Sequence, residues 1–342
     1  MKRTPRKKTS PAAALSAFPG NDRIKKILRL ALEKGRVPNS LIFSGPRGVG
    51  KRRLAVLLAQ AINCERGGVE PCLECPTCLQ IAEGRQPDVW EVEPDGQCIR
   101  IEQMQEVRQA AYVRPLAARR RVFVVADADK MTTDAANCML KILEEPPSYS
   151  HLILVTSMPH LLLPTIKSRC QALAFAPVGR EEIVKALAAT DCPADRAGVI
   201  ALLVDGNLEE AMALDWEEVK AVRQEAWDLF TALQGQGETT AFLRNYAFAK
   251  RDEVRNAMER VLRLTATFCR DAILLRSGGD PSLLLNPDRA GELAGLGARW
   301  DTDEYTRCLD RIEWAIAGLK KSLNMSLLVS SVYRQMGDES HG

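Results

Sequence analysis

The alternation of apolar and polar positions predicts helices and buried strands in the first half of the chain. Apolar residues recur every three or four positions over 22–34, which predicts an amphipathic helix. Short, nearly continuous apolar runs, typical of buried parallel strands, occur at 41–43, 121–126 and 152–156. Helical spacing returns between them at 54–61 and 133–143. Residues 19–176 are therefore expected to form an α/β domain with helices on both faces of a parallel sheet.

The pattern changes after Pro177, where strand signals cease and helical periodicity continues to the end of the chain. Breaks at glycine and proline divide this part into a small helical domain over 177–215 and a larger one over 216–342. Residues 1–18 carry a basic cluster without helical amphipathicity, so we expect a flexible tail.

Composition limits the classes of function. The 342 residues include 47 Lys and Arg and 44 Asp and Glu, a net charge of +3, and five of the positive residues precede residue 9. A body so close to neutral argues against a nucleic-acid binder that acts alone by neutralising phosphates. No apolar run approaches the length of a membrane span, and the N-terminus lacks the apolar core of a secretory signal. We therefore expect a cytoplasmic protein without a membrane partner.

The segment between the first predicted strand and the next helix fits the phosphate-loop pattern G-x-x-x-x-G-K, with Gly45, Gly48, Gly50 and Lys51. Such a loop turns backbone N–H groups toward phosphate oxygens, and its lysine reaches the terminal phosphates. The next position normally supplies a hydroxyl to Mg²⁺ but here holds Arg52, which has no lone pair for a cation. A glycine turn without a ligand is the alternative.

The predicted strand at 121–126 also departs from the pattern of a phosphate-loop ATPase, in which this strand ends in consecutive Asp and Glu residues. Ala126 stands at the expected metal position, and Asp127 follows in place of a water-positioning glutamate. For Asp127 and Asp129 we prefer a simpler interpretation as loop carboxylates that cap the next helix. Metal-dependent hydrolysis of nucleotide by this chain is therefore not expected.

Four cysteines have the spacing C-x7-C-x2-C-x2-C: Cys64, Cys72, Cys75 and Cys78. Two overlapping C-x2-C steps direct thiolates at one tetrahedral ion, and four sulfurs leave no open position for water. The pattern predicts a structural Zn²⁺ that stabilises an insertion in the sheet domain. Unrelated thiols or a redox pair are the alternatives, and the other six cysteines lack partners at ligand spacing.

Arg169 lies in the tripeptide Ser168-Arg169-Cys170, which follows the last predicted strand of the sheet domain. A guanidinium is permanently charged and binds phosphate through a planar fork of donors. By itself such an arginine is more often a surface residue or an ion-pair partner.

Taken together, the phosphate loop, the cysteines, the segment 137–147 (NCMLKILEEPP) and the Ser168-Arg169-Cys170 tripeptide resemble the bacterial clamp-loader branch of the AAA+ superfamily. Within that branch the chain is similar to the delta' subunits of DNA polymerase III. The ATPase subunits, gamma and tau, keep the hydroxyl of the phosphate loop and the Asp-Glu pair, and this sequence has neither. The likeness covers residues 19–176 with specific motifs and the helical remainder more loosely.

The resemblance implies an AAA+ sheet domain with a zinc module at 64–78, a helical lid over 177–215 and a helical collar over 216–342 that oligomerises. It implies a hetero-pentameric ring with gamma or tau subunits and a delta subunit, which loads the sliding clamp onto primed DNA. Arg169 would act in trans as an arginine finger toward ATP on a neighbouring subunit. The residues expected around a degenerate ATP or ADP site are Gly45, Gly48, Gly50, Lys51, Arg52, Asp127 and Thr156.

The second-sensor arginine of the family is missing, and Glu209 or Glu210 stands near its place. A carboxylate there would repel a triphosphate. Two rival hypotheses remain: an ATP-hydrolysing gamma/tau-type subunit of the same machine, and a zinc-dependent module in which Cys64–Cys78 binds DNA. Only Arg66 is positive in that segment, so attraction to a DNA backbone should be weak.

Overall fold

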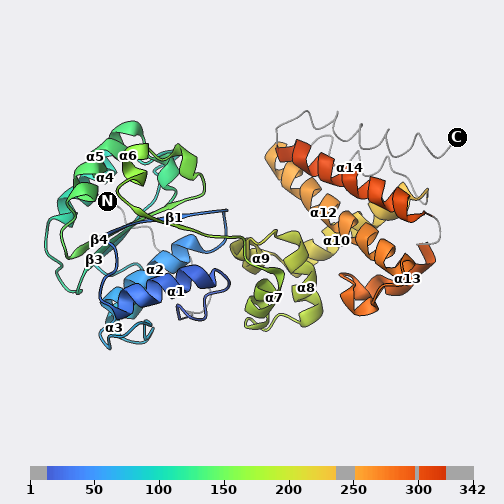
Figure 1. Cartoon of the computed structure of the whole chain (residues 1–342), viewed down its shortest axis with the longest axis horizontal. Coiled ribbons are helices and arrows are strands. Elements are labelled where there is room, and N and C mark those ends of the chain that lie inside the picture. The colour runs from blue at the N-terminus through green and yellow to red at the C-terminus, as the bar shows by residue number, and fades with distance from the viewer. Residues whose placement is uncertain (1–13, 236–250, 297–299, 321–342) are drawn as a thin grey trace. The chain divides into compact units, whose positions relative to one another are not determined.

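The computed structural model describes residues 14–235, 251–296 and 300–320 (Figure 1). The chain divides into two compact units. The sheet unit comprises Met1–Ile183 with Gly206–Glu209, and the helical unit comprises Val184–Asp205 with Glu210–Gly342. Parts of the expected tail (1–13) and of the expected collar (236–250, 297–299 and 321–342) lie outside the described residues.

Five parallel strands form the sheet, in the order β2-β3-β4-β1-β5. Their bounds are β1 Ser40–Ser44, β2 Val89–Val92, β3 Arg121–Val125, β4 Ser150–Thr156 and β5 Gln171–Ala174. Every residue of β1, β3 and β4 is buried, as the continuous apolar runs predict for central parallel strands. The two edge strands, β2 and β5, contain partly exposed or exposed residues.

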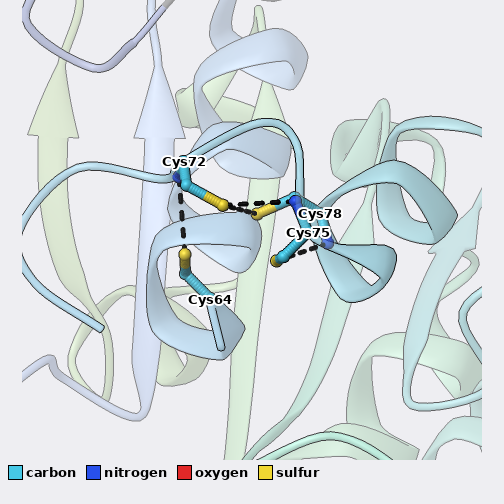
Figure 2. A group of neighbouring side chains, drawn as sticks. All are labelled: Cys64, Cys72, Cys75 and Cys78. Atoms are coloured by element: carbon cyan, nitrogen blue, oxygen red, sulfur yellow. Dashed lines mark hydrogen bonds between the residues drawn. The ribbon is translucent and has the colours of Figure 1, made fainter. Parts of the chain in front are cut away.

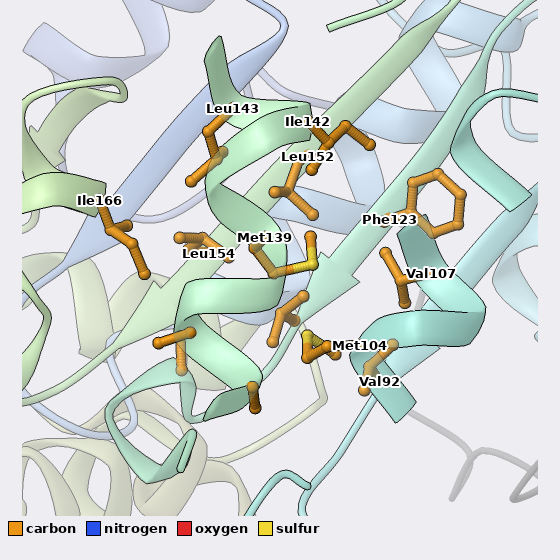
Figure 3. Packing of buried hydrophobic residues seen from close by; sticks show 14 of the residues in the cluster. Val92, Met104, Val107, Phe123, Met139, Ile142, Leu143, Leu152, Leu154 and Ile166 are labelled. Carbon is orange, nitrogen blue, oxygen red and sulfur yellow. The ribbon is translucent and has the colours of Figure 1, made fainter. Parts of the chain in front are cut away.

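Helices cover both faces of the sheet, with α4, α5 and α6 on one side and α1 and α2 on the other (Figure 1). Their bounds are α1 Asp22–Glu33, α2 Lys51–Asn63, α3 Pro76–Ala82, α4 Ile101–Ala111, α5 Thr133–Glu144 and α6 Pro164–Lys167, with short 3₁₀ turns η1 at Ala128–Lys130 and η2 at Pro159–Leu161. Figure 3 shows Met139 of α5 packed with Met104 of α4 and Leu154 of β4 in one buried core. The predicted α/β domain is confirmed.

Glycine is required where β1 passes into α2. Gly45 has φ +139°, and a Cβ built there would lie 2.4 Å from the carbonyl oxygen of Phe175. Gly50 has φ +82°, and its Cβ would lie 2.7 Å from the ring of Phe18. A side chain at either position would meet both a backbone penalty and a steric clash. Phe18 and Leu15, near the end of the segment expected as a tail, are buried.

Among the described residues from 180 onward, the regular elements are helices and short 3₁₀ turns, joined by loops, and there is no strand. The elements are α7 Arg180–Ala188, α8 Ala194–Leu203, α9 Leu208–Ala213, α10 Trp216–Leu233, α12 Arg251–Arg276, α13 Ala290–Leu296 and α14 Thr302–Lys320, with 3₁₀ turns η3 at Pro281–Leu283 and η4 at Pro287–Arg289. In the helical unit α12 packs against both α10 and α14, around an aromatic cluster that includes Phe230, Phe268 and Tyr305. Among the described residues, none of the helices has the length and apolarity needed to cross a bilayer.

Candidate functional site

The carboxyl ends of three central strands meet at one edge of the sheet and form a pocket. Ser44 of β1 is in register with Thr156 of β4, and Val125 of β3 is in register with Leu154. The pocket has a volume of about 320 Å³. It is lined by Arg47, Gly48, Lys51, Arg52, Glu93, Pro94, Ala126, Asp127, Lys130, Val155, Thr156, Ser157 and Glu209. The structure thus brings together most of the residues that the sequence predicts for a nucleotide site.

Lys51, the phosphate-loop lysine, is turned into its own loop. Its side chain is buried, and Nζ donates to the carbonyl oxygens of Gly45, at 2.7 Å, and of Pro46. Burial lowers the pKa of Lys51, and the carboxylates of Glu209 and Asp127 oppose this effect. The ammonium therefore already has hydrogen-bond acceptors within the loop that it belongs to.

Arg52 occupies the position of the missing hydroxyl and forms ion pairs with two carboxylates. Nη2 lies 2.8 Å from Oε2 of Glu91, Nε donates to the same oxygen at 2.8 Å, and Nη2 also contacts Glu93. Burial opposes the charge, but the two glutamates together raise the pKa of Arg52. A fixed cation thus stands beside the phosphate loop at the place where a magnesium ligand would be needed.

The end of β3 offers no paired acidic residues toward the pocket. The side chain of Ala126 has no atom that can bind a metal ion. Asp127 has φ +48° and forms an ion pair with Lys130, in which Oδ2 lies 2.8 Å from Nζ. Asp129 accepts hydrogen bonds from the hydroxyl of Thr156 and from the backbone N–H of Ser157. Both aspartates therefore have partners at this edge of the sheet. Neither has the expected capping role, because Asp127 makes no side-chain cap hydrogen bond to η1 and the N-cap of α5 is Thr132.

The structure distinguishes the two glutamates near the expected second-sensor position. Glu209 lines the pocket, and its backbone N–H donates to the carbonyl oxygen of Gly48 at 3.0 Å. Glu210 belongs to the helical unit, where its carboxylate pairs with Arg260. Of these two glutamates, Glu209 is thus the one whose carboxylate adds negative charge to the phosphate pocket.

The four spaced cysteines converge at a second site (Figure 2). Cys64 ends α2, Cys72 lies in the following loop, Cys75 is the N-cap of α3 and Cys78 lies within α3. All four Sγ atoms lie within 4.8 Å of one another. Backbone N–H groups point at three of the sulfurs: from Cys72 to Cys64 at 3.4 Å, from Cys75 to Cys72 at 3.3 Å and from Cys78 to Cys75 at 3.4 Å.

This cluster can hold a metal ion. Three of its sulfurs belong to buried residues, and the N–H···S contacts orient the sulfur atoms, as expected for donors that share one ion. The backbone N–H groups of Glu74 and Cys75 lower the pKa of the Cys72 thiol to about 6. Nearby, Thr77 donates its N–H and its hydroxyl to Glu65 at 3.1 and 2.7 Å, which stabilises the turn into α3.

Arg169 lies outside the pocket lining, between α6 and β5. Its guanidinium contacts Glu144, the last residue of α5, with Nη2 2.6 Å and Nε 2.9 Å from Oε1. Nη1 donates to the carbonyl oxygen of Thr165 at 2.9 Å. The side chain is one-third exposed.

The carboxylate partners of the two arginines were not predicted from the sequence. Glu91 and Glu93 lie in and just after edge strand β2, whose mixed pattern gave no strand signal, and they lie about 40 residues from Arg52 along the chain. Glu144 lies within the 137–147 segment that carried the resemblance, but nothing in that segment indicates an interaction with Arg169. Only the packed fold brings these pairs together.

Comparison with known proteins finds relatives of this chain. A family profile described as "DNA polymerase III, delta subunit" matches residues 20–179. Subunit delta' of DNA polymerase III from Bacillus subtilis (strain 168) is 32% identical over 264 residues, which span 77% of this chain and 80% of that protein. The chain belongs to the family of DNA polymerase III subunit delta'. The resemblance inferred from the motifs is thereby confirmed.

Another relative by sequence matches over a smaller part of its own length. Subunit tau from Bacillus subtilis (strain 168) is 33% identical over 202 residues, which cover 57% of this chain and 36% of that protein. Among solved structures, a DNA polymerase III gamma subunit-related protein from Thermotoga maritima has a TM-score of 0.44 and 18% identity, covering 92% of this chain and 99% of that one. The expected parallel-sheet domain with a cysteine cluster, followed by helices, is confirmed by the structure.

Proposed function

We propose that this chain is a non-hydrolysing subunit of a bacterial clamp loader and supplies Arg169 to ATP bound on a neighbouring ATPase subunit. In this proposal it assembles through its collar with gamma or tau subunits and a delta subunit in a hetero-pentameric ring. The ring acts in the cytoplasm and loads the sliding clamp onto primed DNA. The ATPase subunits hydrolyse nucleotide, and this chain completes one of their sites.

The observation that carries the proposal is the pairing of Arg52 with Glu91 and Glu93. At the position where a phosphate-loop ATPase has a magnesium ligand, this chain has a guanidinium whose charge is balanced by two carboxylates. Ala126 removes a second metal ligand at the end of β3. Both features argue against hydrolysis at this chain's own pocket, whereas Arg169 lies outside that pocket and is partly exposed.

An arginine supplied in trans stabilises the negative charge that develops on the transferred phosphoryl group. In well-studied NTPases such a residue accelerates hydrolysis by about 10³ to 10⁵-fold. The effect depends on a planar donor fork with a permanent charge. Arg169 meets these requirements without any metal on its own subunit.

The test is the DNA- and clamp-stimulated ATPase rate of a loader reconstituted with wild-type chain or with Arg169→Ala. We expect a steep loss of rate while ring assembly persists. Lys167→Ala is the matched control, because Lys167 is an exposed basic residue two positions away with no side-chain partner among the described residues. Equal rates for wild type and Arg169→Ala would contradict the proposal.

The rival function, a gamma/tau-type ATPase, is tested with the same chain alone in Mg-ATP. Relatedness to subunit tau is the observation that favours it. We expect no steady turnover. Turnover that Lys51→Ala abolishes would favour the rival, because Lys51 would then act on the nucleotide and not only within its own loop.

For the cysteine cluster we propose that the ion is Zn²⁺ with a structural role. Four thiolates complete a tetrahedral Zn²⁺ shell and leave no position for a reactive water. The ion would join the end of α2 to α3, two helices that also pack against each other. Binding of ATP or ADP in the phosphate pocket stays a prediction.

A further inference from the structure

The guanidinium of Arg169 is surrounded by acceptors from its own subunit. Nε and Nη2 both point at Oε1 of Glu144, at 2.9 and 2.6 Å. Nη1 donates to the carbonyl oxygen of Thr165 at 2.9 Å and contacts the hydroxyl oxygen of Ser168 at 3.3 Å. Four contacts therefore involve all three nitrogens of the side chain.

The position of Glu144 matters because of how arginine binds phosphate. A guanidinium has five N–H donors, and it commonly grips an oxyanion through two parallel N–H groups along one edge. The edge formed by Nε and Nη2 is the one that the Glu144 carboxylate occupies here. An incoming phosphate that used this edge would have to displace the carboxylate.

We propose that Glu144 is an intramolecular competitor for the phosphate that Arg169 contacts, so that the arginine exchanges one anion for another when a neighbouring ATP site closes. The inference rests on the proposed function, because it presupposes that Arg169 acts in trans. Glu144 is a positioning residue in this scheme and does not itself touch nucleotide. Its carboxylate holds the guanidinium in one orientation until phosphate replaces it.

The pair is suited to exchange because it is neither buried nor fully exposed. The side chains of Arg169 and Glu144 are 33% and 49% exposed. Water can therefore solvate either charge when the pair separates, and no buried charge is left without a partner. An ion pair at such a position stabilises a protein only weakly. Its free energy corresponds to about a two- to fivefold change in the equilibrium between the paired and separated side chains. A phosphate with a larger negative charge can therefore displace the carboxylate readily.

The test uses a loader reconstituted with the full chain carrying Glu144→Gln, and measures KM for ATP and kcat of the stimulated ATPase. If the carboxylate competes with phosphate, its removal should lower KM by about two- to fivefold and leave kcat unchanged. The difference between wild type and variant should shrink as salt is raised, since only the wild type has this ion pair to lose. Glu144→Ala is a second variant that should act in the same direction.

Glu145→Gln is the matched control, because it removes the adjacent carboxylate, which has no side-chain hydrogen bond or ion pair among the described residues. A merely structural role for Glu144 would raise KM or lower kcat, and either result would overturn the inference, as would a Glu144→Gln loader that behaves like Glu145→Gln. If Arg169→Ala leaves the ATPase unchanged, the proposed function fails as well. A loss with Arg169→Ala and no change with either Glu144 variant would refute only the competition.

Discussion

The backbone N–H of Glu209 donates a hydrogen bond to the carbonyl oxygen of Gly48, at 3.0 Å. This contact fixes the segment that follows Gly206 onto the phosphate loop, and a Cβ on Gly48 would collide with the side chain of Asn207. The Glu209 carboxylate consequently lines the pocket, where its charge acts on Lys51. A phosphate loop that normally attracts anions thus faces an anion of its own chain.

Glu209→Gln should increase the affinity of the full-length chain for ADP by about tenfold, because it removes a negative charge from the pocket and keeps the side-chain shape. Titration with a fluorescent ADP analogue, in the presence and absence of Mg²⁺, measures the change. Glu210→Gln is the control, since that carboxylate pairs with Arg260 in the helical unit. Equal affinity in wild type and Glu209→Gln would show that this carboxylate does not limit binding.

Cys78→Ser should remove the bound zinc and destabilise the sheet unit. Cys78 is buried and lies in α3, so its thiolate links that helix to the end of α2 through the ion. We expect the free energy of unfolding to fall by on the order of 3 kcal/mol, comparable to the loss of a native cross-link. Metal analysis and thermal denaturation measure the two effects.

Cys98→Ser serves as the control for the cysteine prediction, because Cys98 is half-buried and lies outside the metal-holding cluster. This variant should keep one zinc per chain and melt like the wild type. Wild-type protein that contains no zinc, or Cys78→Ser protein that retains a full complement, would contradict the proposed ion.

Asp88→Asn should lower stability in a pH-dependent way. The buried carboxylate accepts N–H groups from Leu116, Ala117 and Ala118, and Oδ1 lies 2.7 Å from Nη2 of Arg121. Burial acts to raise the pKa of Asp88, but these donors outweigh it and lower the pKa below its ordinary value. Because the variant leaves a buried arginine without its carboxylate, we expect a loss of about 3 kcal/mol at pH 7.

The sign of the pH effect follows from the lowered pKa of Asp88. Its contribution is fully present above the unfolded-state pKa of about 4 and is lost as the pH falls through the lower native value. Urea denaturation measures the free energy of unfolding. The difference in this free energy between wild type and Asp88→Asn should be constant from about pH 7 to 5 and should shrink below about pH 4. Asp95→Asn, at an exposed position, should show no such difference.

Local signals in the sequence were sufficient for the central strands, the phosphate loop and the cysteine cluster. Continuous apolar runs mark β1, β3 and β4 because strands buried on both faces need apolar side chains throughout. The cysteine spacing predicted one cluster because ligands so near in sequence can reach a common ion without help from the rest of the fold. Edge strands β2 and β5 were not predicted, since they are short and only partly buried.

The sequence by itself determined that Arg52 cannot bind a magnesium ion and that Arg169 is permanently charged, because these are properties of the side chains. The tertiary structure alone decided that Arg52 pairs with Glu91, that Arg169 pairs with Glu144, and that Glu209 lines the pocket. The physical reason is that an ion pair depends on distance in space. Packing of the sheet and its helices sets those distances between residues that are remote along the chain.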